Sequence, residues 1–364
     1  MPNVTAEEAR RTRAASLFAT PDKPGLDALL VTNLHNVRYL TGFTGSNGAV
    51  LLFKDRSAVL FTDPRYTVQS QQQVRCRVRI AKGPLTAAIV QEIDRAGARR
   101  VGFEQDNMTV AQMAGFSKVL PPKAQFKPAT GLIENLRLVK DAGEIEKIRR
   151  SVETNSRALD AALKRFKAGM LESELAAEID YQNRKLGAEA PAFDTIVAAG
   201  PRAALPHAHP GPNSIEPGIL LIDMGAFQEG YASDMTRMIH VGQPTPKYKK
   251  AYRAVLEAQL AAIAAVKPGT TTSAVDRAAR EVLKQHGLER EFIHSTGHGL
   301  GLEIHELPRI GRKDKTRLAE GMAITIEPGV YIEGWGGIRI EDTVLVNAGG
   351  CEVLTPTPKT LRVI

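Results

Sequence analysis

The sequence has few cysteines and no long apolar segment. Among its 364 residues only Cys76 and Cys351 are cysteines, and their spacing is not that of a cysteine-based zinc site. Two isolated thiols indicate a reducing compartment, although the two can in principle form a disulfide. No stretch approaches the roughly 20 apolar residues that span a membrane. The first residues, MPNVTAEEARRTRAASLF, lack the apolar core of a signal peptide, so we expect a cytoplasmic protein without membrane association.

Basic residues outnumber acidic ones but do not gather in one place. Lys and Arg total 48 against 40 Asp and Glu, which gives a net charge of +8. The densest basic runs, VRCRVRI and GRKDKTR, are short and interrupted. We therefore expect a solvated basic surface and no nucleic-acid partner. The hydrophobic content of 43% is typical of a globular protein, and the length suits one large or two ordinary domains.

The first third of the sequence alternates apolar and amphipathic segments. GLDALLVTN predicts a buried strand, and GAVLLF and SAVLFTD, which flank KDR, predict a β-hairpin. LTAAIVQEIDRAG predicts a helix that ends at Gly97, ARRVGFE the next strand, and VAQMAGFSKVL a further helix. We therefore predict an α/β domain over residues 1–135, closed by the Pro-rich segment PPKAQFKPATG, and a second domain over residues 136–364.

The second domain contains an internal repeat. Two amphipathic segments, DAGEIEKIRRSVETNSRALDAALKRFKAG and ESELAAEIDYQNRKLG, predict helices that stop at Gly169 and Gly187. A second pair of helix-like segments follows, and its glycines, Gly269 and Gly287, lie 100 residues further on. A chance recurrence of helix-end glycines is the alternative explanation.

Four carboxylates follow the same repeat. EPGILLID resembles AEGMAITIE, which places Asp223 opposite Glu327 at a shift of 104 residues. SDMT resembles EDT, which places Asp234 opposite Glu341 at a shift of 107 residues. We expect Asp223 and Asp234 on facing arms of a hairpin, beside apolar runs where a carboxylate is costly unless it is paired or binds a metal. A pseudo-two-fold axis would bring all four carboxylates together between the two halves.

Five of the eight histidines lie near these acids: His207, His209, His294, His298 and His305. A lone histidine is usually structural, but this clustering favours a functional role for His207, His298 and His305. His298 is the natural imidazole ligand, because HSTGHGLGLEIH is rich in glycine and lets backbone approach a ligand closely. His305 is placed to donate to a reaction intermediate, and His207 lies in a Pro-bounded loop suited to a pocket wall. For His209 and His294 the alternatives stay open.

Four carboxylates and one imidazole suit a pair of hard or borderline divalent cations. Such ions can share a water molecule and make it a nucleophile near neutral pH. The oxygen-rich donor set favours two Mn²⁺ ions, with Co²⁺ or Zn²⁺ as alternatives. Arg339 lies two residues before Glu341, so we expect it on the same face of one strand, either paired with a ligand carboxylate or in contact with substrate.

Taken together, these motifs resemble the metal-dependent pita-bread peptidases of family M24, which include proline-specific aminopeptidases, prolidases and methionine aminopeptidases. NVRYLTGFTGSNG and FTDPRY are similar to strings of the creatinase/prolidase N-terminal domain. The resemblance implies an α/β (α+β) architecture. An N-terminal α/β domain is followed in sequence by a pita-bread catalytic domain of two pseudo-symmetric halves. It covers nearly the whole chain.

The resemblance also implies roles for individual residues. Asp234 and Glu341 would bridge two metal ions, Asp223 would bind one of them, and His298 and Glu327 would bind the other. Glu327 would also act as general acid and base on the water that bridges the ions and attacks the substrate as hydroxide. The remaining positions are catalytic or substrate-binding: His305 would stabilise the tetrahedral intermediate, His207 would contact the substrate carbonyl, and His294 and Arg339 would lie near substrate.

Among the members of this group, an Xaa-Pro aminopeptidase is the first expectation and an Xaa-Pro dipeptidase the alternative. Both would act on peptides with proline in second position, and a homodimer is expected from the resemblance. The creatinase branch lacks the full ligand set, and methionine aminopeptidases resemble only the C-terminal half. The rival from another class is a non-enzymatic binding protein on the same fold, whose usual sign is the loss of metal ligands.

Overall fold

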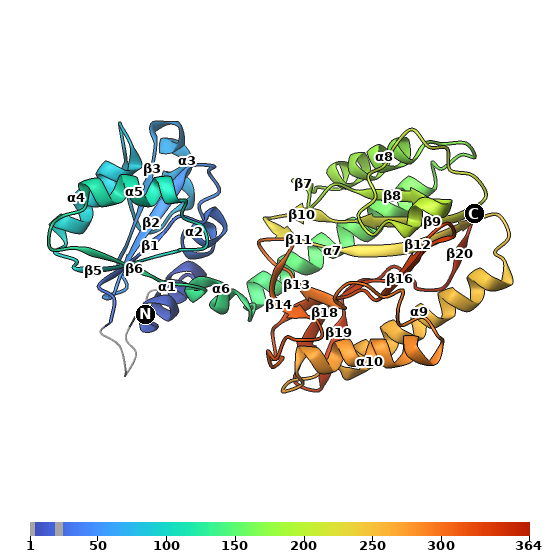
Figure 1. The fold of residues 1–364 in the computed structure, drawn as a ribbon. Coiled ribbons are helices and arrows are strands. Elements are labelled where there is room, and N and C mark those ends of the chain that lie inside the picture. Colours follow the sequence, from blue (N-terminus) through green and yellow to red (C-terminus); the bar gives the residue numbers. More distant parts are fainter. Residues whose placement is uncertain (1–3, 19–24) are drawn as a thin grey trace. The chain divides into compact units, whose positions relative to one another are not determined.

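The computed structural model describes residues 4–18 and 25–364. The chain divides into two compact units, Met1–Arg137 and Leu138–Ile364, where the sequence suggested a division after residue 135 (Figure 1). Within the described ranges, no helix combines the length and the apolar content needed to cross a membrane.

A six-stranded mixed sheet forms the centre of the N-terminal unit. Its order is β4-β3-β2-β1-β5-β6, with β2 antiparallel to both of its neighbours and the other pairs parallel. The strands are β1 (Ala28–Val31), β2 (Gly48–Phe53), β3 (Ala58–Thr62), β4 (Arg77–Ile80), β5 (Arg100–Phe103) and β6 (Gln125–Pro128). The helices are α1 (Ala6–Ser16), α2 (Leu34–Thr41), η1 (Pro64–Tyr66), α3 (Thr67–Gln73), α4 (Leu85–Arg95), α5 (Val110–Val119) and α6 (Leu132–Arg137).

Most elements predicted for this unit are confirmed, with one exception. β2 and β3 form the predicted hairpin, and α4 ends two residues before Gly97, whose φ of 63° is left-handed. The Pro-rich segment after α5 was expected only to close the domain, but its residues Gln125–Pro128 form β6, parallel to β5. A proline at the end of an edge strand is tolerated because its missing N–H interrupts no interior ladder.

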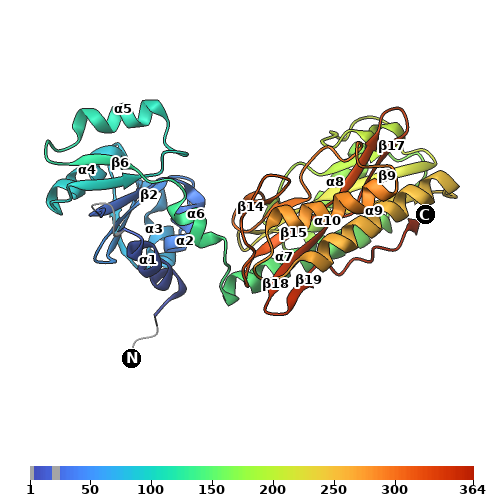
Figure 2. The same ribbon diagram turned by 60° about the horizontal axis from the view of Figure 1, so that its bottom comes forward.

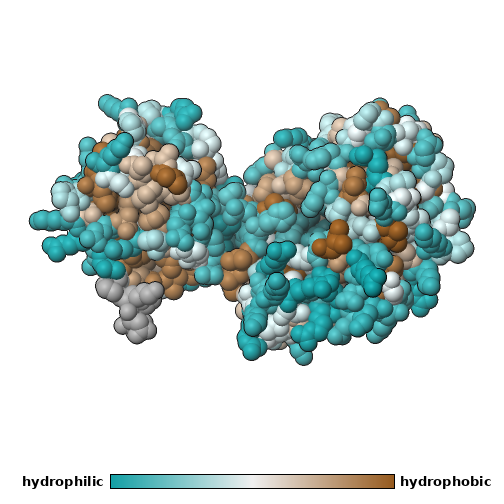
Figure 3. Space-filling model, in the orientation of Figure 1, coloured by the Kyte–Doolittle hydropathy of each residue, from teal (hydrophilic) through white to brown (hydrophobic). Residues whose placement is uncertain are grey.

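Helix α5 leaves most of its surface in solvent. Phe116 is its buried residue, whereas Val110 is 87% and Val119 51% exposed. Figure 3 shows apolar side chains gathered on the surface over this part of the unit. A capping box between Thr109 and Gln112 fixes the start of the helix, so its stability does not depend on burial alone.

The C-terminal unit consists of two halves, each with two helices and a sheet whose strands pair antiparallel, except that β20 (Arg362–Val363) runs parallel to β12 (Met235–Val241). In the first half, α7 (Ala142–Leu163) and α8 (Glu172–Lys185) accompany the sheet β20-β12-β9-β8. In the second, α9 (Pro246–Ala265) and α10 (Thr272–Gln285) accompany the sheet β14-β13-β15-β18-β19. Figure 1 shows α8 on one side of the unit and α9 and α10 on the other, and Figure 2 shows α9 and α10 side by side.

The strands of this unit lie in four sheets, of which β7-β10-β11 and β16-β17 are the two smaller ones. Their bounds are β7 (Ala190–Pro191), β8 (Ile196–Ala199), β9 (Gly218–Met224), β10 (Ala226–Gln228), β11 (Tyr231–Ala232), β12 (Met235–Val241), β13 (Gly297–Gly299), β14 (Glu306–Ile310), β15 (Ala323–Ile326), β16 (Gly329–Ile332), β17 (Gly336–Arg339), β18 (Asp342–Asn347), β19 (Gly350–Val353) and β20 (Arg362–Val363). A short 3₁₀ helix, η2 (Gly200–Ala204), follows β8.

The two halves repeat each other around the carboxylates. β9 pairs antiparallel with β12, as β15 does with β18. Asp234 and Glu341 each stand directly before the second strand of the pair. Asp223 is the next-to-last residue of β9, and Glu327 directly follows β15. The predicted pita-bread architecture with an internal repeat is thus confirmed, and a chance recurrence of glycines does not account for it.

Glycines in the HSTGHGLG motif let strands approach one another. A Cβ on Gly297 would overlap the carbonyl oxygen of Thr325, and a Cβ on Gly299 would overlap that of Leu307. The neighbours that require glycine here are therefore the backbones of adjacent strands rather than a ligand. Together these glycines carry His298 at the centre of β13.

Gly299→Ala should lower the free energy of unfolding by about 3 kcal/mol, because the added methyl group meets a backbone carbonyl that cannot rotate away. Gly349→Ala is the matched control in the same unit, since its Cβ would lie 3.9 Å from its nearest neighbour, Asn347 Oδ1. Urea denaturation measures both. Equal unfolding midpoints for the two variants would contradict the close packing.

Candidate metal centre

Five polar residues converge from separate strands of the two halves. Asp223 and Asp234 come from the β9–β12 region, His298 from β13, Glu327 from the end of β15, and Glu341 from the residue before β18. All four carboxylates are at least partly buried, with Asp234 5% and Glu341 2% exposed. The sequence therefore folds both halves so that their acids meet, as the repeat predicted.

The donor atoms of these residues lie close together. Ligand atoms of Asp234, His298 and Glu341 all fall within 4.8 Å of one another. His298 Nε2 lies 3.5 Å from Asp234 Oδ2 and 3.5 Å from Glu327 Oε1. His298 Nδ1 donates to the carbonyl oxygen of Gly299 at 3.0 Å, which fixes the ring and leaves Nε2 directed at the carboxylates.

Two buried carboxylate oxygens of these five residues have no hydrogen-bond partner among the described residues. Asp223 accepts from Arg339 through Oδ2 at 2.6 Å, but its Oδ1 is unpartnered. Glu341 accepts from Thr236 through Oε2 at 2.8 Å, but its Oε1 is unpartnered. A buried charged oxygen without a partner is costly, so both atoms fit a bound cation.

The pKa values report the same excess of negative charge. Burial and the nearby carboxylates of Asp223 and Glu327 raise the pKa of Asp234 to about 7, despite its hydrogen bond with His298. Burial and the neighbouring acids also raise the pKa of Glu341 and of Glu327. Burial lowers the pKa of His298, but Asp234 and Glu327 outweigh it and raise the value to about 9. Without metal ions, protons therefore compensate part of the charge.

The donor set fits divalent cations on chemical grounds. Carboxylate oxygens with one imidazole match the preference of Mn²⁺ and related ions. Bound cations would reverse the repulsion that raises these pKa values. The residues that converge here are the five that the sequence analysis assigned to the metal ions.

Two geometric expectations for this site were wrong in detail. Asp223 and Asp234 do not face each other directly, because Asp223 pairs with Thr236 and Asp234 lies just before β12. Arg339 and Glu341 do not share one strand, because Arg339 ends β17 and β18 begins only at Asp342. Between Arg339 and Glu341 the chain passes from the β16-β17 sheet to the sheet that contains β18. Sequence spacing alone does not reveal such a crossing.

Arg339 nevertheless reaches the acids that it was expected to contact. Its Nη2 donates to Asp223 at 2.6 Å, its Nε to Thr236 Oγ1 at 2.9 Å, and its Nη1 to Tyr331 Oη at 2.6 Å. Thr236 in turn donates to Glu341. The guanidinium thus orients carboxylates from both halves, which favours the first of the two roles left open by the sequence.

The sequence analysis missed Thr236 and Tyr331. Thr236 lies two residues after Asp234 in an apolar strand, where an isolated threonine was the available signal. Burial raises the pKa of Tyr331 to about 12, so its phenol stays protonated. It accepts from Arg339 and donates to His294 Nε2 at 2.9 Å. An aromatic residue near a ligand is too common a pattern to predict this link.

The candidate histidines differ in their surroundings. His305 packs edge-to-face on His298, with ring centroids 4.4 Å apart, and burial and the charges of His298 and His207 lower its pKa. His294 donates from Nδ1 to the Ser295 carbonyl at 2.7 Å, and burial and the charge of Arg339 lower its pKa to about 4. The charge of His207 also acts on His294, so these three histidines lie near one another.

Among the described residues, the ring of His209 makes no hydrogen bond or ring contact with His207, His294 or His305. Its ring is exposed, and its backbone carbonyl accepts from Arg202 Nη2 at 2.6 Å. The backbone of His209 thus helps to fix the loop.

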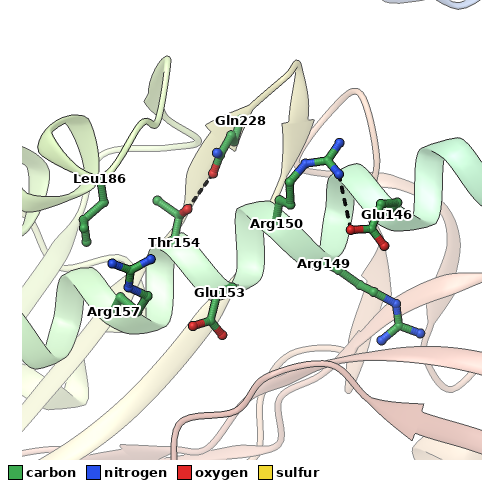
Figure 4. A pocket seen from close by; sticks show the side chains of 8 residues that line it. All are labelled: Glu146, Arg149, Arg150, Glu153, Thr154, Arg157, Leu186 and Gln228. Atoms are coloured by element: carbon green, nitrogen blue, oxygen red, sulfur yellow. Dashed lines mark hydrogen bonds and ion pairs between the residues drawn. The ribbon is translucent and has the colours of Figure 1, made fainter.

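A surface hollow of about 390 Å³ lies on α7, apart from the metal ligands (Figure 4). Arginines are prominent in it, but Arg149 pairs with Glu352 at 2.5 Å and Arg150 with Glu229 at 2.7 Å. The charges of Arg149 and Arg150 are therefore already compensated, and at these positions the hollow presents a solvated ion-pair surface.

Comparisons with known proteins agree with this geometry. Residues 146–348 match the profile of Metallopeptidase family M24, and residues 13–139 match the Creatinase/Prolidase N-terminal domain. The chain is 38% identical to an Xaa-Pro dipeptidase of Pyrococcus furiosus, over 96% of this chain and 99% of that protein.

Solved structures are similar over almost the whole chain. An Xaa-Pro dipeptidase from Bacillus anthracis superposes with a TM-score of 0.94 at 38% identity, covering 98% of this chain and 100% of that one. An X-Pro aminopeptidase from Thermotoga maritima superposes with a TM-score of 0.90 at 37% identity, covering 97% and 100%.

Metal binding should strengthen with rising pH, because Asp234, Glu341 and His298 hold protons that a cation displaces. The folded-state pKa values of Asp234 and His298 lie above the reference values of 3.8 and 6.5. The stability that these protons give the metal-free protein is therefore complete at low pH and is lost as pH rises through about 7 to 9. The increase in Tm on adding Mn²⁺ should accordingly grow between about pH 6 and about pH 8.5.

Differential scanning calorimetry with and without Mn²⁺ measures this increase at each pH. Ca²⁺ at equal concentration controls for ionic strength. An increase in Tm that is constant or shrinks with pH would show that these groups are not protonated in the metal-free protein.

Proposed function

This chain belongs to metallopeptidase family M24, and on that premise we propose that it is a metal-dependent Xaa-Pro dipeptidase. The observation that carries the proposal is the end-to-end similarity to Xaa-Pro dipeptidases in a chain where Asp234, His298 and Glu341 cluster and Glu327 and Asp223 lie beside them. The sequence analysis ranked the aminopeptidase first. Several similar proteins are named Xaa-Pro dipeptidase or prolidase, which favours the dipeptidase, while the similar structure of an X-Pro aminopeptidase keeps that activity as the second candidate.

Asp223, Asp234, His298, Glu327 and Glu341 would hold two divalent ions, with Mn²⁺ as the proposed physiological metal. When bound, such ions supply Lewis acidity and a water molecule that is nucleophilic near neutral pH. The protein holds the donor atoms in place: Arg339 fixes Asp223, Thr236 fixes Glu341, and the Gly299 carbonyl fixes His298. This support limits the reorganisation needed during the reaction.

Glu327 is proposed to move the proton. Burial raises the pKa of its carboxyl group, which favours a role in accepting and releasing a proton. It would take a proton from the attacking water and deliver it to the proline nitrogen as the C–N bond breaks. That nitrogen carries no hydrogen in an Xaa-Pro bond, so the leaving amine must receive a proton to depart as neutral proline.

The histidines are proposed to act on the substrate carbonyl. His305 is exposed beside His298, and its lowered pKa leaves it neutral, so a ring N–H can donate to the oxygen as negative charge develops. His207 is also exposed and would orient the same carbonyl. His294 and Arg339 are joined through Tyr331, which gives them a shared positioning role at the substrate side of Asp223.

The proposed dipeptidase should cleave an Xaa-Pro dipeptide at least about tenfold faster, in kcat/KM, than a tripeptide with proline second. Both substrates, incubated with Mn²⁺, are compared by release of the free N-terminal amino acid. Faster release from the tripeptide would assign the aminopeptidase activity instead. If Mn²⁺ is bound but neither peptide is cleaved, the proposed substrate class is wrong, and a binding protein on this fold becomes the better account.

His305→Ala should reduce kcat by about 100-fold and leave Mn²⁺ content unchanged, because His305 acts on the developing charge and is not a ligand. Asp234→Ala should lose both metal and activity. His286→Ala is the matched control, since His286 pairs with Glu257 on the outside of α9 and α10. Metal content is measured by mass spectrometry and turnover with the dipeptide. Loss of metal from His305→Ala would make His305 a ligand, and full activity of Asp234→Ala would contradict the two-metal assignment.

A further inference from the structure

The loop that carries His207 has little regular structure of its own. It runs from the end of β8 at Ala199 to Ser214, through η2, and contains four prolines: Pro201, Pro206, Pro210 and Pro212. Proline has no N–H, so backbone hydrogen bonding within the loop is limited. A side-chain group from outside the loop can therefore add to the backbone hydrogen bonds that Glu172 and Ser173 make with Asn213 and Gly211.

Glu172, the first residue of α8, supplies that group. Its carboxylate is fully buried, with 0% exposure. It accepts from the backbone N–H of Ala199 at 2.8 Å and of Gly211 at 3.2 Å, and from Asn213 Nδ2 at 3.1 Å. One carboxylate thus joins the two ends of the loop.

Arg202 extends this attachment into the middle of the loop. Its Nε donates to both oxygens of Glu172, at 3.1 and 3.0 Å, and its Nη2 donates to the carbonyl of His209 at 2.6 Å. His207 lies between these attached points. The carbonyl of Pro206, directly before it, accepts from Arg339 Nη1 at 3.4 Å.

The second half of the unit shows that a helix start does not require a carboxylate here. Thr272, the first residue of α10, stands 100 residues after Glu172. The two residues make equivalent backbone hydrogen bonds: the N–H of Thr272 donates to the Thr316 carbonyl, and the N–H of Glu172 donates to the Asn213 carbonyl. Thr272 Oγ1 instead donates to Asp314 at 2.7 Å. The reach of Glu172 to Ala199 and Arg202 is therefore an addition that concerns the His207 loop.

We propose that Glu172, acting through Arg202, is a positioning residue for His207; the assignment rests on the catalytic part given to His207 in the proposed function. The carboxylate fixes the loop so that His207 faces the substrate carbonyl beside His294 and His305. It touches no reacting atom. Loss of its charge frees the loop while leaving the metal ligands in place.

Hydrogen exchange tests the attachment independently of activity. In Glu172→Gln of the full chain loaded with Mn²⁺, the side-chain amide cannot accept every donor, so peptides over residues 199–213 should exchange at least about tenfold faster. Peptides over α8 should keep their rates. Glu174→Gln, two residues along the same helix, is the control, because Glu174 is exposed and its carboxylate accepts from the Leu171 N–H at the helix start. Unchanged exchange over 199–213 would overturn the proposal.

Kinetics test whether the attachment acts through His207. Glu172→Gln should lower kcat about tenfold with full metal content and unchanged KM, but should lower it less than about twofold when introduced into His207→Ala. Equal losses in both backgrounds would overturn the proposal, since a general structural effect adds regardless of His207. If Glu172→Gln does not fold, Arg202→Met, at a side chain 35% exposed, replaces it with the same expected pattern.

The two proposals fail in different ways. A wild-type protein that cleaves no Xaa-Pro bond overturns the proposed function and with it the catalytic role of His207. In that case unchanged or faster exchange over residues 199–213 still decides whether Glu172 holds the loop. A wild-type protein that cleaves the dipeptide, with Glu172→Gln equally active, overturns the positioning role alone.

Discussion

The repulsion among four carboxylates withheld from water is the constraint on which the C-terminal unit depends. Burial and mutual repulsion raise the pKa values of Asp234, Glu327 and Glu341, so the negative charge of the site is not fully compensated by the protein. His298 and Arg339 offset part of the charge, yet buried oxygens of Asp223 and Glu341 lack a partner among the described residues. A folded protein tolerates such a cluster where function requires cations that complete it.

The surrounding structure can be understood as the support that keeps these acids together. Two sheets bring equivalent strands to one place, and Arg339 and Thr236 then link acids from both halves. Glycines at Gly297 and Gly299 allow β13 to lie close enough for His298 to join them. The fold thus places the large electrostatic cost at the centre of a rigid frame, where small displacements are resisted on every side.

Much of this arrangement could be predicted from the sequence because duplicated motifs preserve their order. The four acids lie at matching places relative to strands, so pattern alone predicted that Asp223, Asp234, Glu327 and Glu341 would meet. The sequence did not reveal that the chain changes ladders between Arg339 and Glu341, because a two-residue spacing looks the same in one strand or across two. Nor did it reveal Glu172, a helix-start acid like many others until the loop donors around it are known. The motifs also do not predict the length of the peptide substrate, because both candidate activities use the same reacting groups.

The duplication is symmetric in its acids and asymmetric in its histidines, and this difference has a chemical consequence. β13 contributes His298, whereas β8, the strand that pairs with β9 as β13 pairs with β15, contributes only apolar residues in IVAA. One ion would therefore have a nitrogen donor and the other mainly oxygen donors. The first half instead supplies a histidine, His207, from the loop after β8. Under the proposed function, one half would use its imidazole to hold a cation and the other would use it to face the substrate, so the duplicated frame would provide the two unlike positions that an asymmetric bond cleavage requires.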